Sequence, residues 1–233
     1  MTILQFIAKR TGLGKRHAKK MLNSGNVVLN QSAIADGNVP LGKFDHLTVA
    51  GETLQSNTAR YILLNKPAGI LSATTDRKHK TVIDLIDEPW SSELHLAGRL
   101  DRSTTGLVIL TNDSRFSESL THPNNKIPKT YLVETDQPIT PEAIAKFRSG
   151  MSFDKEKIRT QPAIVELLES NHYRLTIFEG KHHQIKRMFL RFGIQVTKLH
   201  RESIGPYEQQ KNLQSGTYQR FNPSPDHLTP PTP

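Results

Sequence analysis

The sequence predicts an α+β fold in two parts, a small basic module of about fifty residues followed by a larger, strand-rich domain. Two patterns support this prediction. The first fifty residues hold two helix-like and three short strand-like segments. After residue 60, strand-like segments outnumber helical ones and do not alternate regularly with them, which disfavours a parallel α/β fold. The length of 233 residues allows such a chain to bury a core.

The N-terminal module begins with two predicted helices. Ile3, Leu4 and Ile7 have helical spacing, and Gly12 ends that segment. A second helix is expected from residue 14 to about residue 24, with an apolar stripe and an otherwise basic surface. Strands are expected at 27–29, 33–35 and 47–49, with a tight turn at 30–31 between the first two. We place the first domain at residues 1–50.

Residues 51–59 are polar and lack periodicity, so we expect a linker there. The second domain is expected to cover 60–222. Its predicted strands are 61–64, 107–111, 130–134, 163–168, 173–178 and 194–199, and its predicted helices are 114–120, 141–148 and 182–192. The tail at 223–233 contains five prolines and is expected to be disordered.

Charge and composition narrow the classes of partner. The formal net charge of +9 favours polyanions, because neutralising phosphates releases counterions. Charge by itself does not separate RNA from DNA or from an acidic membrane surface. The absence of cysteine excludes disulfides and thiolate metal sites. No apolar run reaches the length of a membrane span, and the start lacks a signal-peptide pattern, so a cytoplasmic location without membrane attachment is expected.

Four basic residues crowd the second predicted helix: Lys15, Arg16, Lys19 and Lys20. Lys15 shares a face with Lys19, and Arg16 shares one with Lys20. A solvated helical face is one reading of such a run. However, no acidic residue precedes Asp36, so these charges lack helical partners and can follow a phosphate backbone. We interpret them as a nucleic-acid contact.

A second feature is the segment Gly-Arg-Leu-Asp at 98–101, just before a predicted buried strand. In extended backbone, Arg99 and Asp101 point to one side and Leu100 points to the other. A structural ion pair or an aspartate that caps a turn would give the same pattern. The residues alone therefore leave open whether Asp101 is structural or chemical.

The segments 11–20 and 24–31 resemble the alpha-L RNA-binding domain, which occurs in a small-subunit ribosomal protein and in several RNA-modifying enzymes. The resemblance covers about residues 1–50. It implies that the helical pair binds structured RNA and that Lys15, Arg16, Lys19 and Lys20 contact phosphates. Gly14 stands where the family often has serine; glycine is a usable but weaker helix cap.

Four motifs of the larger domain resemble, in order and spacing, those of the pseudouridine synthases. They are the strand and turn at 61–69, the segment 98–111 that contains Gly-Arg-Leu-Asp, the segment Lys-Thr-Tyr-Leu-Val at 129–133, and the segment at 179–189 that is continued by 199–205. The resemblance spans about residues 1–222. It is fullest to the synthases that act on one uridine of 16S ribosomal RNA in the small subunit. It implies a mainly antiparallel mixed sheet with flanking helices.

The resemblance also implies roles for individual residues. Asp101 is central, as nucleophile or base at the sugar, and Lys186 is the cation that offsets its desolvation. Tyr131 stacks on the uracil, although strand packing would explain it without the family. Arg99 helps to hold the target nucleotide out of its stack. The implied reaction involves no redox step and no phosphoryl transfer, so neither a cofactor nor a metal is expected. Ser103 replaces an acidic residue that many relatives carry, but it is not the nucleophile.

The resemblance also implies a partner, 16S ribosomal RNA in a partly assembled small subunit, and a monomeric protein. Two other functions share these features. One is a sister synthase acting on 23S ribosomal RNA or on transfer RNA; the other is a non-catalytic RNA-binding factor in ribosome assembly, which the intact Asp101, Tyr131 and Lys186 disfavour. The pair His182–His183 suggests a metal, but adjacent helical residues diverge by about 100°, so histidines that face RNA or lie in a loop are favoured.

Overall fold

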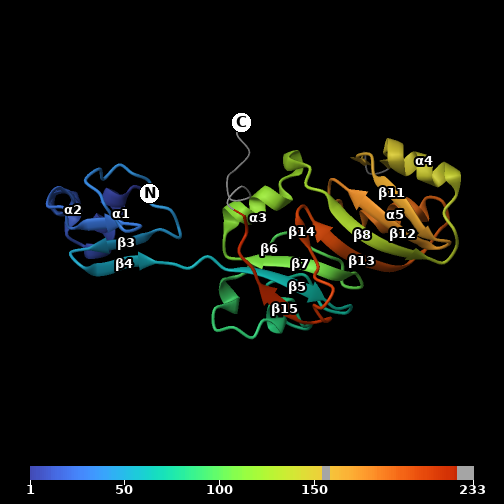
Figure 1. Cartoon of the computed structure of the whole chain (residues 1–233), viewed down its shortest axis with the longest axis horizontal. Helices are drawn as coiled ribbons and strands as arrows, with labels where there is room; N and C mark the ends of the chain where they lie inside the picture. Colours follow the sequence, from blue (N-terminus) through green and yellow to red (C-terminus); the bar gives the residue numbers. More distant parts are fainter. Residues whose placement is uncertain (154–157, 225–233) are drawn as a thin grey trace. The chain divides into compact units, whose positions relative to one another are not determined.

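The computed structural model describes residues 1–153 and 158–224, and the chain divides into two compact units, Met1–Ala59 and Arg60–Pro233 (Figure 1). The proline-rich tail, expected to be disordered, lies outside the described residues from 225 onward. Across the described part of the chain, no helix combines the length and the apolar character needed to cross a bilayer.

The first unit combines two helices with a small sheet of strand order β2-β1-β3-β4. Its elements are α1 (Ile3–Thr11), α2 (Gly14–Asn23), β1 (Val27–Leu29), β2 (Ser32–Ala33), β3 (His46–Val49) and β4 (Glu52–Ser56). The predicted turn between β1 and β2 is present, and both of its residues, Asn30 and Gln31, have positive φ. The prediction of a linker at 51–59 is wrong in part, because residues 52–56 form β4. This strand is at the edge of the sheet and mostly exposed, so it lacks apolar alternation.

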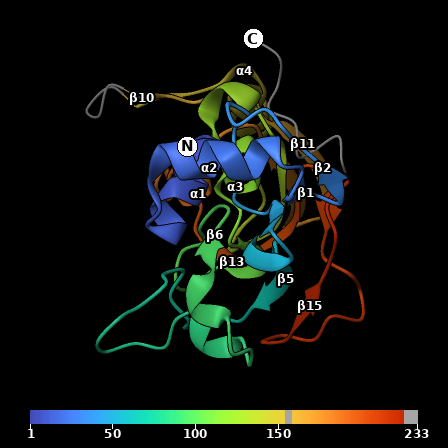
Figure 2. The same cartoon turned by 90° about the vertical axis from the view of Figure 1, so that its left-hand side faces the viewer.

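Helix α1 is capped at both ends, as its sequence suggests. Thr2 and Gln5 form a capping box at its start, and Gly12 ends it with a φ of 70°. Helices α1 and α2 lie side by side (Figure 2). Their buried residues form one core with the small sheet: Ile3, Ile7, Ala18, Leu22, Val27, Leu47 and Val49. The basic side chains of α2 therefore lie outside that core.

The second unit is built on a nine-stranded mixed sheet of order β11-β12-β8-β13-β7-β5-β15, in which β6 also pairs with β7 and β14 with β13. Its strands are β5 (Tyr61–Lys66), β6 (His95–Leu96), β7 (Thr105–Thr111), β8 (Lys129–Thr135), β11 (Ile164–Glu169), β12 (His172–Ile177), β13 (Val196–Ile204), β14 (Tyr207–Glu208) and β15 (Tyr218–Arg220). A separate two-stranded sheet pairs β9 (Ser152–Phe153) with β10 (Ile158–Arg159). The α+β fold and the mainly antiparallel pairing are confirmed.

Three α-helices flank this sheet: α3 (Ser114–Thr121), α4 (Pro141–Ser149) and α5 (Gln184–Leu190). Helix α5 begins two residues later than predicted, because His183 has a φ of 50° and cannot continue a right-handed helix. Short 3₁₀ helices occur at Ile83–Leu85, Ser91–Glu93 and Pro123–Asn125. These turns and the two-residue strands are too short to leave a periodic pattern in the sequence.

The pairing of β7 with β13 is parallel, whereas the other strand pairs of this sheet among the described residues are antiparallel. Gly106 lies opposite Arg201 in this pair. A Cβ atom at Gly106, which has a φ of 103°, would lie 2.3 Å from the backbone oxygen of Arg201. Glycine therefore permits the two strands to approach, and their contact fixes where the loop before β7 lies.

Candidate active site

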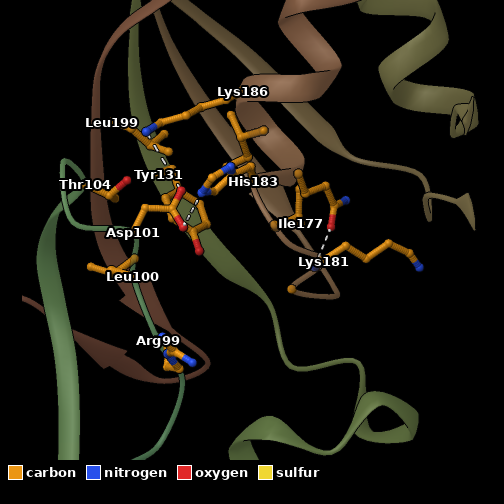
Figure 3. A pocket seen from close by; sticks show the side chains of 13 residues that line it. Arg99, Leu100, Asp101, Thr104, Tyr131, Ile177, Lys181, His183, Lys186 and Leu199 are labelled. Carbon is orange, nitrogen blue, oxygen red and sulfur yellow. Dashed lines mark hydrogen bonds and ion pairs between the residues drawn. The ribbon is translucent and has the colours of Figure 1, made fainter. Parts of the chain in front are cut away.

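Asp101 lies in the loop between β6 and β7, at the mouth of a pocket. Strands β8, β12 and β13, the turn before α5 and the start of α5 itself form the other walls. Figure 3 shows Asp101 among Tyr131, His183 and Lys186, with Arg99 farther along the same loop. The lining residues are Arg99, Leu100, Asp101, Thr104, Tyr131, Ile177, Gly180, Lys181, His183, Gln184, Ile185, Lys186 and Leu199. Residues from four separate stretches of the chain thus meet at one carboxylate.

Two basic side chains lie beside the Asp101 carboxylate. Lys186 Nζ is 3.9 Å from Asp101 Oδ2, and it also donates a hydrogen bond of 2.8 Å to Ser103 Oγ. His183 Nε2 is closer, at 3.4 Å from Oδ1. The Asp101 side chain is 27% exposed, so solvent weakens but does not remove these attractions. The expected neighbourhood of Asp101 and Lys186 is present, with the lysine at ion-pair distance rather than in a direct hydrogen bond.

His183 was not predicted as a neighbour of Asp101. Its left-handed backbone is at the N-terminal end of α5, and its ring stacks on that of His182 with 3.8 Å between centroids. Within residues 1–153 and 158–224, no cluster of three or more acidic or histidine side chains is arranged to hold a metal ion. Periodicity could not have placed His183 here, because a helical assignment puts its ring in a different direction.

Apolar groups form much of the remaining wall of the pocket. Tyr131 is 7% exposed, and it reaches the pocket from the middle of β8. Leu100, Ile185 and Leu199 are also buried there, and Leu100 belongs to the main core. A flat aromatic ring and aliphatic walls facing a carboxylate suit a ligand with a planar, partly polar ring.

Lys66, a residue not predicted from the sequence, anchors the loop that carries Asp101. Lys66 is fully buried, and its ammonium donates to the backbone oxygens of Pro67 (3.0 Å), Arg102 (3.2 Å) and Thr104 (2.9 Å). Burial lowers the pKa of Lys66 to about 8, partly offset by the negative charge of Asp101. The ammonium thus connects the end of β5 to the residues that follow Asp101.

Arg201 holds the residues that precede Asp101. It is 1% exposed and donates to the backbone oxygens of Leu107 (2.8 Å), Arg99 (3.3 Å) and Gly98 (3.4 Å). Its burial within a strand gave no distinctive signal in the sequence. Arg99 itself is exposed and lines the pocket, as required for the contact with a nucleotide that we expected of it.

The remaining predicted contacts, Lys15, Arg16, Lys19 and Lys20, belong to the first unit. All four side chains are exposed on α2, whereas Ala18 and Leu22 on the same helix are buried. The structure therefore presents them to solvent and brings together Asp101, Tyr131, Lys186 and Arg99 at the pocket of the second unit.

Comparisons with known proteins agree with this arrangement. A family model described as RNA pseudouridylate synthase matches residues 60–191. The chain is 38% identical to the ribosomal small subunit pseudouridine synthase A of Salmonella typhimurium, over 94% of this chain and 95% of the relative. Its identity to the Escherichia coli K12 protein of the same name is 36%, with the same coverage. A crystal structure described as a pseudouridylate synthase matches with a TM-score of 0.68 and 34% identity, over 95% of this chain and 96% of that one.

Proposed function

This chain belongs to the RNA pseudouridylate synthase family, and from that premise we propose that it converts one uridine of small-subunit 16S ribosomal RNA to pseudouridine, with Asp101 at the centre of the reaction. The enzyme is an isomerase that acts on RNA. The observation that supports the site is the convergence on one carboxylate of a buried tyrosine from β8 and of a histidine and a lysine from the start of α5.

The reaction breaks the C1′–N1 bond of uridine and forms a C1′–C5 bond after the uracil has turned. The proton on C5 is lost and N1 gains one, so the product has the atoms of the substrate and no electrons enter or leave. The chemistry needs a group that assists departure of the uracil and a group that handles the C5 proton. A carboxylate is able to act at the sugar as nucleophile or as base.

We assign these tasks to the side chains of the pocket. Asp101 acts at the ribose, and the positive charge of Lys186 attracts its carboxylate from 3.9 Å. Tyr131 lies where its ring is able to stack on the uracil. Its hydroxyl is a candidate to take up the proton that leaves C5. Arg99, exposed at the rim, helps to keep the nucleotide out of its helix, because base chemistry requires extrusion from the stack.

The first unit supplies affinity for RNA in this proposal, through Lys15, Arg16, Lys19 and Lys20. Its helices and basic surface have the features expected of an alpha-L RNA-binding domain. We propose a partly assembled small subunit as the substrate, a monomeric enzyme, and a reaction in the cytoplasm, where this RNA is made. No cofactor or metal is assigned, because the bond exchange is redox-neutral.

Asp101→Asn tests the proposal, because asparagine has nearly the same shape but cannot serve as nucleophile or base. Release of tritium from [5-³H]uridine in small-subunit RNA, free and in assembly particles, measures the reaction. We expect the variant to release no tritium while it binds RNA about as tightly as the wild type, since the lost interaction belongs to the transition state. Substantial release by the variant would contradict the role of Asp101. If the wild type releases more tritium from 23S ribosomal RNA or transfer RNA than from small-subunit RNA, the substrate would be reassigned. If it releases none from any RNA, the enzymatic function would be overturned.

A further inference from the structure

A second cleft adjoins the Asp101 pocket. The two hollows share Arg99, Tyr131, Gly180 and Lys181 in their linings. The pocket has a volume of about 80 Å³, whereas the cleft has about 480 Å³. Small-molecule sites usually measure roughly 300–1,000 Å³. The pocket therefore takes only part of a nucleotide, and the cleft has room for the rest.

Lys129 lies in this cleft at the start of β8, two residues before Tyr131. Alternate residues of a strand face the same side of the sheet, so both side chains point to the side on which the ligand would lie. Two residues of a strand advance by about 7 Å. That step is of the same order as the distance from a base to the phosphate of its own nucleotide.

Two cations of the cleft, Lys129 and Arg201, have no neutralising carboxylate among the described residues. Lys129 Nζ donates to the backbone oxygen of Ile127 at 2.9 Å, and the buried Arg201 donates to three backbone oxygens. In the part of the chain that the structure describes, neither cation forms an ion pair with Asp or Glu. Glu179 also lines the cleft, but its carboxylate lies 2.7 Å from Lys181 Nζ and accepts a hydrogen bond from the backbone N–H of Gln161.

This arrangement is electrostatically costly for the protein by itself. Burial and the nearby charge of Arg201 lower the pKa of Lys129 to about 8. An apolar side chain of similar length would fill the same space without repulsion from Arg201 or loss of hydration. An anion in the cleft would offset this electrostatic cost, because it attracts both cations and accepts hydrogen bonds from the remaining N–H groups of Lys129.

We propose that this cleft is a phosphate subsite, in which Lys129 binds a phosphodiester of the substrate strand beside the target uridine and Arg201 adds its charge from beneath. Arg99 and Lys181 are at the boundary between the subsite and the pocket, where they are able to follow the strand from base to phosphate. The inference rests on the proposed function for the identity of the ligand. Lys129 is a binding and positioning residue in it, since it acts on the phosphate and not on the reacting atoms.

The first measurement is the salt dependence of binding to a small-subunit RNA fragment, which needs no turnover. Lys129→Met should reduce the slope of log K against log salt by about 0.7–0.9, the value for one lost phosphate contact. Lys129→Arg should keep the wild-type slope. Lys146→Met, which removes an exposed charge of the same unit outside the cleft, is the matched control and should also keep it. Lys129→Met should melt no lower than the wild type because repulsion from Arg201 is removed, and Lys129→Gln provides a second neutral variant.

The second measurement identifies the phosphate. A single neutral methylphosphonate is placed at each linkage around the mapped uridine. The wild type and Lys146→Met should lose about 10-fold or more in affinity at one linkage, as expected for one charge-assisted contact, and Lys129→Met should lose nothing more there. Equal losses for all three proteins at every linkage, or an unchanged slope for Lys129→Met, would overturn the subsite. If the wild type forms no pseudouridine but Lys129→Met alone changes the slope, the proposed function fails and the phosphate site remains.

Discussion

Replacement of Lys15, Arg16, Lys19 and Lys20 with alanine should weaken RNA binding without impairing the chemistry. The four side chains are exposed on α2, on a unit separate from the Asp101 pocket. Each phosphate contact contributes about 0.7–0.9 to the slope of log K against log salt, so the loss of four should lower the slope by about 2.8 to 3.6. Between 50 and 200 mM salt, the affinity of the fourfold variant for RNA should therefore fall about 100-fold less than that of the wild type.

Fluorescence anisotropy with a labelled small-subunit RNA fragment, measured across that salt range, gives the slope. The double variants Lys15→Ala/Lys19→Ala and Arg16→Ala/Lys20→Ala test the two faces separately, because residues four apart share a face. Lys15→Arg/Lys19→Arg keeps the charges and serves as the control. Alanine favours helix, so α2 should remain folded. Turnover at saturating RNA should stay near the wild-type value. An unchanged slope in the fourfold variant would refute our assignment of these residues to the RNA contact.

Two further outcomes follow from the site. Lys186→Met should lower turnover by about 100-fold or more through loss of the charge beside Asp101, while Lys186→Arg should retain much more. Equal tritium release by the Met variant and the wild type would remove Lys186 from the reaction. Lys66 has a pKa lowered to about 8, below its usual 10.5, so between these values the unfolded chain holds more protons than the folded one. As pH increases from 8 to 10.5, the unfolding free energy of the wild type should therefore rise relative to that of Lys66→Met. Denaturant titrations measure this difference, and a difference that stays constant with pH would contradict the burial of a charged Lys66.

Much of the fold was predictable because long elements leave a periodic signal. The helices at 3–11 and 141–149 carry apolar residues at helical spacing, and the strand at 107–111 is a short apolar run with β-branched residues, which favours a buried strand. The sequence predicts a linker where the edge strand β4 lies, because a mostly exposed strand needs no apolar alternation. The sequence also predicts a start of α5 that is two residues too early, because the left-handed backbone occurs at a histidine, His183, and not at a glycine.

The sequence by itself determined the α+β class, the basic character of α2, and the residues Arg99, Asp101, Tyr131 and Lys186 as candidates, because these depend on residue type, local spacing and motifs along the chain. The tertiary structure alone decided which groups meet. The parallel approach of β7 and β13, permitted by Gly106, determines which residues lie next to Asp101. That approach joins residues almost one hundred positions apart, and no local pattern records contacts made over such a distance.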